Sequence, residues 1–132
     1  MLKTHDSTAI TVVRTHRNAW SHPDWEKTRE LLAPDVHTVI TTTQPMKATI
    51  ELTGIEAYME PRIIIAISLI EPGSVHEISA IGDESNALIL VTMRIGLDPG
   101  ETIVTLARAI LYLLDEHKKI KEERDKYFIL SQ

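Results

Sequence analysis

The sequence contains no cysteine in its 132 residues. Disulfide bonds, thiolate nucleophiles and cysteine-based zinc or iron–sulfur sites are therefore excluded, and the composition fits a reducing cytoplasm. Any metal ion would have to be bound by His, Asp and Glu. The six histidines form no i, i+4 pair and have no companion acid at ligand spacing, so we expect no metal site.

Long apolar runs and basic runs are also missing. The longest apolar stretch, residues 63–70, is interrupted by Ser68 and is far shorter than the roughly 20 residues that cross a bilayer. The start, MLKTHDS, lacks the apolar core of a signal peptide. A net charge of -5 argues against nucleic acid, whose binding requires neutralised phosphates. We expect a cytoplasmic protein without membrane or nucleic-acid partners.

Motifs that hold phosphates or activate a serine are absent. There is no phosphate-binding glycine loop, dinucleotide fingerprint or nucleophile elbow. We therefore expect no cofactor, and the remaining chemistry is that of acids, bases and hydrogen-bond donors.

The residues that are present predict a globular α+β protein. Hydrophobic residues at 43% and charged residues at 25% are close to the averages for soluble domains, and residues 1–132 suit a single domain. Helical spacing of apolar residues predicts helices over 6–20 and about 23–32, and a third that begins at Gly54, which Pro61 kinks or restarts. Strands are expected at 36–43 and 48–52.

The C-terminal half changes to strand periodicity. Strands are predicted over 75–81, 87–97, 103–114 and 120–130, joined by the turns GDESN, DPGE and DEHKK. Such short links predict an antiparallel meander, so that three helices pack on a curved, mostly antiparallel sheet with one pocket on its concave side. The outer face of 106–114 is apolar, and a second copy of the chain would cover it, which predicts a homodimer.

The last predicted strand carries Glu123, Asp125 and Tyr127 at every second position. Side chains alternate across a strand, so all three point to one face. Two acids and a phenol on one face of an otherwise apolar half predict a polar patch inside a pocket. The alternative is that these charges lie outside, in an exposed ion pair that contributes little.

Several strings resemble the SnoaL-like branch of the nuclear transport factor 2-like (NTF2-like) superfamily. They are NAWSHPDWEKTRELLAPDV, TGIEAYME, SAIGDESNALIL and LYLLDEHKKIKEERDKYF, and together they span nearly the whole chain. The resemblance implies a cystatin-like, conical α+β barrel with one deep pocket, and frequent dimerisation. It implies no single chemistry, because the fold carries isomerases, polyketide cyclases, epoxide hydrolases and binding proteins.

A more local resemblance is to limonene epoxide hydrolase, whose site is an Asp–Arg–Asp relay around a water molecule. The string KIKEERDKYF resembles the segment of the relay aspartate, which falls on Asp125, and VTMRIGLDPG resembles that of the arginine, which falls on Arg94. The place of the second aspartate is taken by Gly96, and Asp98, two residues further, is the candidate to replace it. The ketosteroid isomerase mechanism is disfavoured.

Other residues complete the candidate site. An arginine beside Asp125 would keep that carboxylate ionised as a base, with Glu123 as the partner that holds a proton. His37 is a second acid–base candidate, with a solvent-facing structural role as its alternative. The ligand-binding candidates are Trp20, Tyr58, Glu123 and Tyr127; the tryptophan and tyrosines could equally be core residues.

Two functions follow. The first is a cofactor-independent acid–base enzyme, of isomerase, polyketide cyclase or epoxide hydrolase type, that acts on a small hydrophobic polyketide, terpenoid or steroid-like molecule. The second is a non-catalytic module of the same fold that binds a small ligand or serves as a dimeric partner, and the missing relay aspartate favours it.

Overall fold

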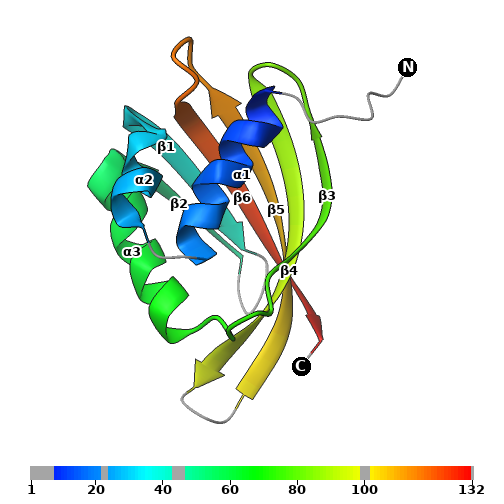
Figure 1. Ribbon diagram of the computed structural model, residues 1–132. Coiled ribbons are helices and arrows are strands. Elements are labelled where there is room, and N and C mark those ends of the chain that lie inside the picture. The colour runs from blue at the N-terminus through cyan, green and yellow to red at the C-terminus, as the bar shows by residue number, and fades with distance from the viewer. Residues whose placement is uncertain (1–7, 22–23, 43–46, 99–101, 132) are drawn as a thin grey trace.

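The computed structural model describes residues 8–21, 24–42, 47–98 and 102–131; at 19–21, 63–68, 97–98, 102 and 131 it describes the backbone alone (Figure 1). The elements follow in the order α1 (Thr8–Ser21), α2 (Trp25–Glu30), β1 (Leu32–Thr42), β2 (Ala48–Thr53), α3 (Ile55–Ser68), β3 (His76–Gly82), β4 (Asn86–Asp98), β5 (Thr102–Leu114) and β6 (Ile120–Ser131). This is the α+β arrangement that the sequence predicts.

Six strands form one curved sheet in the order β2-β1-β6-β5-β4-β3. The last four strands make the predicted antiparallel meander, and β1 joins it in parallel to β6. Since β2 and β3 are the two outer strands of this order, the sheet is open. The expected conical barrel is therefore corrected to a curved, open sheet.

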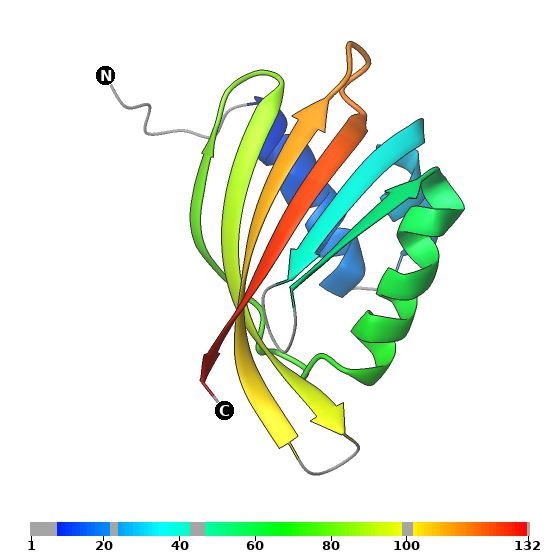
Figure 2. The ribbon, with the colours of Figure 1, turned by 180° about the vertical axis from the view of Figure 1, so that it is seen from behind.

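The helices cover one face of the sheet (Figure 1). Helix α1 contacts β3, β4 and β5, α3 contacts β1 and β2, and α2 contacts α1 and β1. Figure 2 shows the sheet from behind, where none of the three described helices covers it. The core lies between the two layers and includes Ala9, Val13, Val36, Tyr58, Met59, Ile89, Ile110 and Ile120, all at most 1% exposed.

The boundary between α2 and β1 differs from the prediction. Asp24 caps α2 by accepting a hydrogen bond from the Lys27 backbone N–H at 3.1 Å, as an N-cap residue does. The helix then ends at Glu30 and Leu32 already pairs with Ile120 of β6. Pairing with a distant strand thus overrides the helical pattern that extended to residue 32.

Gly54 connects β2 to α3. Its φ of 98° lies in the left-handed region, which side chains rarely adopt. Its N–H donates to Val36 O at 2.8 Å, and its carbonyl accepts from the Tyr58 N–H at 3.1 Å as the helix begins. Helix α3 continues through Pro61 without a restart. The glycine therefore sets the direction of the helix that carries Tyr58.

No helix within the described residues is long and apolar enough to cross a membrane.

Replacement of Gly54 by alanine should lower the free energy of unfolding by about 1 kcal/mol, because alanine resists a positive φ. An added Cβ would meet no atom within 4 Å, so the cost comes from the backbone alone. Urea titration measures it, with the exposed Thr53→Ala as the control. Equal stability of the glycine and alanine proteins would contradict this account.

Candidate functional site

Strand β6 places three of the predicted residues under the helices. In register, Glu123 lies between Thr38 and Tyr112, Asp125 between Ile40 and Ile110, and Tyr127 between Thr42 and Arg108. Glu123 is 0% and Asp125 2% exposed. The alternating pattern of the strand therefore turns Glu123 and Asp125 into the protein, as the sequence predicts, and not to the solvent.

Two arginines bridge the two carboxylates. Arg62 of α3 places Nη2 2.7 Å from Glu123 Oε2 and 3.3 Å from Asp125 Oδ2. Arg108 of β5 places Nη2 3.1 Å from Glu123 Oε2 and 2.7 Å from Asp125 Oδ2. Arg62 also donates from Nη1 to Tyr58 O at 2.7 Å, which ties its guanidinium to its own helix. Each carboxylate thus forms ion pairs with both arginines. The ion pairs of Arg62 connect helix α3 to the sheet.

A second chain of hydrogen bonds reaches Glu123 from the helices. Tyr58 Oη donates to Glu123 Oε1, and His16 Nε2 of α1 lies 2.9 Å from Tyr58 Oη. A phenol has one proton, and here it points to the carboxylate. The contact with His16 Nε2 therefore extends the chain of polar groups from strand β6 through Tyr58 of α3 to helix α1.

The two carboxylates titrate as a coupled pair. Burial disfavours the charge of Glu123, but the guanidinium groups of Arg62 and Arg108, with the Tyr58 hydroxyl, outweigh it and hold the Glu123 pKa below its ordinary value. Burial raises the pKa of Asp125 to about 7; Arg108 opposes this rise, and the neighbouring charge of Glu123 adds to it. The sequence expectation is thus reversed: Glu123 is the ionised partner and Asp125 is the proton carrier.

The hydrogen-bond partners of the two acids explain why the pKa of Glu123 is lowered and that of Asp125 is raised. Glu123 uses both oxygens, one toward Tyr58 and one toward the arginines. Asp125 uses Oδ2 alone, and its buried Oδ1 has no hydrogen-bond partner among the residues that the structure describes. Since hydrogen bonds to the charged form favour it, Glu123 takes the negative charge more easily.

The groups around the pair stay neutral near pH 7. Burial lowers the pKa of His16 to about 4. Burial also raises the pKa of Tyr58, Tyr112 and Tyr127 above the ordinary value. Asp125 is therefore the group of this cluster that changes its charge near neutral pH.

The predicted pairing of Asp125 with Arg94 is wrong. Arg94 lies on the other face of β4, where its side chain is 52% exposed and sits 3.4 Å from Glu71 Oε2. Its position between the buried Met93 and the half-buried Ile95 explains this, because alternate residues of a strand point to opposite faces.

His37 also lies on the outer face, with Nδ1 3.2 Å from Glu122 Oε1 and Nε2 3.8 Å from Glu51 Oε1. The structure gives it the solvent-side role that was the alternative to catalysis. Asp98 ends β4 and Trp20 lies near the end of α1, but the side chains of both lie outside the described residues.

Tyr58, Glu123, Asp125 and Tyr127 come together as predicted, whereas Arg62, Arg108, Tyr112 and His16 were missed. Two spacings carried a signal. Arg108 is two positions from Ile110 and four from Tyr112 on a predicted strand, hence on one face with both. Arg62 follows Tyr58 by four residues on a predicted helix, hence on its buried side.

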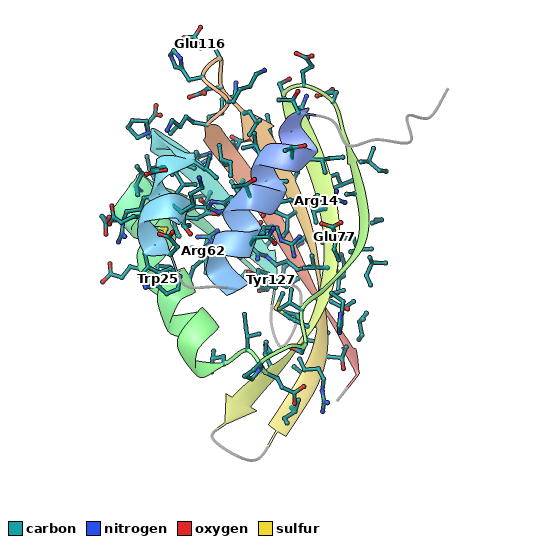
Figure 3. All side chains as sticks on the ribbon, viewed as in Figure 1. Arg14, Trp25, Arg62, Glu77, Glu116 and Tyr127 are labelled. Atoms are coloured by element: carbon teal, nitrogen blue, oxygen red, sulfur yellow. The ribbon has the colours of Figure 1, made fainter. Side chains whose placement is uncertain are left out.

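A separate surface groove of about 290 Å³ lies between α1 and β3, lined by Arg14, Arg17, Asn18, Val75 and Glu77. Figure 3 shows Arg14 and Glu77 there, and Arg62 and Tyr127 between the helices and the sheet. None of the predicted site residues lines this groove. Within the described ranges, no group of three His, Asp or Glu side chains could hold a metal ion.

Comparison with solved structures identifies the fold. SalBIII, an epoxide hydrolase/cyclase-like enzyme with a role in pyran ring formation in polyether salinomycin, matches 91% of this chain and 90% of its own with a TM-score of 0.70 and 13% identity. A steroid delta-isomerase from Pseudomonas aeruginosa matches 96% and 84% with a TM-score of 0.67 and 13% identity. RV0760c from Mycobacterium tuberculosis, in complex with estradiol-17beta-hemisuccinate, matches 91% and 93% with a TM-score of 0.71 and 15% identity.

Other structures of this shape are described as NTF2-like or as having a cystatin-like fold. The chain has the NTF2-like fold. No family model matches the sequence, and no curated protein matches it. At 13–15% identity these likenesses concern the fold, so the residues of the site have to carry any functional argument. On this fold the ionisable cluster occupies the helix-covered face of the sheet.

Stability should depend on pH through Asp125. The ordinary aspartate pKa of 3.8 applies to the unfolded chain, and the folded value is about 7. Between these values the folded protein binds more protons, so stability falls as pH rises, by about 1 kcal/mol per pH unit, and is flat above. Asp125→Asn removes this slope. Its Tm relative to wild type should therefore rise between pH 5 and pH 8.

Thermal unfolding at both pH values measures this difference, with the exposed Asp35→Asn as the matched control. An Asp125→Asn protein whose Tm difference from wild type is the same at pH 5 and pH 8 would show that Asp125 is ionised throughout.

Proposed function

We propose that this protein is a cofactor-independent acid–base enzyme that moves a proton on a small, largely apolar molecule. The observation that carries the proposal is the buried Asp125, whose Oδ1 has no partner among the described residues and whose pKa is raised to about 7. A carboxyl poised near the working pH both takes and returns protons efficiently.

The cluster assigns different roles to the two acids. Arg62 and Arg108 hold Asp125 through Oδ2, so that Oδ1 keeps a fixed direction while it exchanges the proton. Glu123 stays ionised and raises the proton affinity of its neighbour. Such a division between two carboxyls, in which the environment separates their pKa values, is a recurring arrangement in acid–base enzymes.

Three reactions fit one carboxyl that abstracts a proton and returns it to another atom: isomerisation, ring closure and epoxide opening. The similarity to an epoxide hydrolase/cyclase-like enzyme and to a steroid delta-isomerase supports this range. The chain also contains a carboxylate–arginine–carboxylate set, in which Arg108 pairs with both Asp125 and Glu123. Arg108 is thus the arginine of this set instead of Arg94, and Glu123 is its second carboxylate.

A non-catalytic binding role is the second candidate. RV0760c, which has the same fold, is a complex with a steroid ester. Binding alone needs few polar groups, whereas proton transfer needs several that converge on one substrate atom. Two carboxylates, two guanidinium groups and a tyrosine within hydrogen-bond contact favour the enzyme over the binder.

Asp125→Asn should lower kcat by at least about 100-fold, because the amide cannot accept the proton. Turnover is measured on a β,γ-unsaturated ketosteroid, by the absorbance of its conjugated product, and on a terpene epoxide, by chromatography of the diol. Arg108→Gln should also lose activity, while the matched surface variant Arg94→Gln should retain it.

Full activity of Asp125→Asn would overturn the proposal, and so would equal losses in the two arginine variants. Absence of turnover in the wild-type protein across both substrate classes would favour the binding module. Native mass spectrometry of freshly purified protein then reports a retained ligand and the oligomeric state together.

A further inference from the structure

The cluster has an unequal number of permanent charges. Arg62 and Arg108 are always cationic, and Glu123 is the anion that neutralises one of them. The second cation is balanced by Asp125 when that residue is ionised. When Asp125 carries a proton, the cluster has one positive charge in excess.

Among the residues that the structure describes, no other group that faces Asp125 supplies the missing negative charge. Strands β1 and β4 contribute hydroxyl or apolar side chains at the adjoining register positions, among them Thr38, Ile40 and Ile89. The titratable neighbours are neutral near pH 7, and they are His16 of α1, Tyr58 of α3, Tyr112 of β5 and Tyr127 of β6. Arg17 of α1 is paired with Glu77 at 3.1 Å. An anion that neutralises the cluster must therefore come from outside it.

Unsatisfied donors occur on the same two cations. Arg62 Nε and Arg108 Nε are buried and have no hydrogen-bond partner within the part of the chain that the structure describes. A buried polar group without a partner destabilises the folded state, and more so when it belongs to a charged side chain. Planar guanidinium groups pair best with planar oxyanions, which accept two hydrogen bonds side by side.

We infer that the site binds a hydrophobic monocarboxylate, and that Asp125 is protonated when this ligand is bound. The inference rests on the proposed function, to which it adds the charge class of the ligand. It also links binding to catalysis. When Asp125 Oδ1 takes a proton from a neutral carbon acid, the electron pair stays on the substrate as an oxyanion. That oxyanion has the charge of the bound carboxylate, beside the same two arginines.

The test uses 2-naphthoate and its neutral analogue 2-naphthamide on the chain of 132 residues. Isothermal titration calorimetry in two buffers of different ionisation enthalpy measures the protons taken up. Because Asp125 is about half protonated at pH 7, naphthoate should bind there with uptake of about half a proton. Its affinity should fall about tenfold between pH 6 and pH 8. Naphthamide should bind more weakly, without proton uptake or pH dependence.

Asp125→Asn separates this inference from the enzyme proposal. The amide is neutral at every pH, so the variant should bind naphthoate at pH 8 about tenfold more tightly than wild type does, and with no proton uptake. The same variant should be inactive. A variant that binds naphthoate and retains turnover overturns the enzyme proposal alone.

Four outcomes overturn the inference itself. They are equal affinity for naphthoate and naphthamide, naphthoate binding without proton uptake in wild type, loss of naphthoate binding in a folded Asp125→Asn protein, and failure of both probes to bind. The Tm of the variant establishes that it is folded, and Arg94→Gln, whose charge lies on the outer face, serves as the matched charge control.

Discussion

Two carboxylates buried two residues apart on one strand are the constraint on which the rest of the structure depends. Glu123 and Asp125 would repel each other and would be poorly solvated, so cations must reach them from other elements. Arg108 comes from the adjacent strand β5, and Arg62 comes from helix α3 across the interior. Two backbone features position Arg62 beside the carboxylates. They are the left-handed turn at Gly54, which starts helix α3, and the continuation of that helix through Pro61.

Much of this arrangement is contained in local sequence patterns. Period-two alternation and hairpin turns predict all four strands of the meander, with every end within one residue of the observed one. Alternation along β6 also predicts that Glu123, Asp125 and Tyr127 share a face. These features are local, since each depends on residues a few positions apart. Elements and faces are therefore the predictable part of the protein.

The arginine partner was not predictable in the same way. Arg94 and Arg108 both lie on predicted strands near β6: Arg108 is on β5, next to β6, and Arg94 is on β4, the strand beyond it. What separates them is register and face: Arg108 pairs opposite Tyr127, whereas Arg94 pairs opposite Thr105 on the outer side. A shift of one residue exchanges the two faces. A match of short strings to another family does not determine which of the two faces a strand residue points to. Arg62 was missed for a different reason: it lies in a helix, and the placement of that helix depends on packing over the whole sheet.

The stability of the fold does not by itself explain the cluster. Replacement of a buried ion pair by well-packed apolar residues is often neutral or stabilising, because the desolvation of two charges offsets their attraction. Four ionisable side chains in the interior of a chain of 132 residues therefore demand a reason beyond folding. The hydrogen bonding and the pKa of Asp125 indicate what that reason is. A carboxyl kept for structure would have both oxygens satisfied and its charge secured, as Glu123 does. Asp125 instead retains one oxygen without a partner among the described residues and a proton that leaves near neutral pH. That is the state expected of a group that exchanges its proton with something the chain itself does not provide.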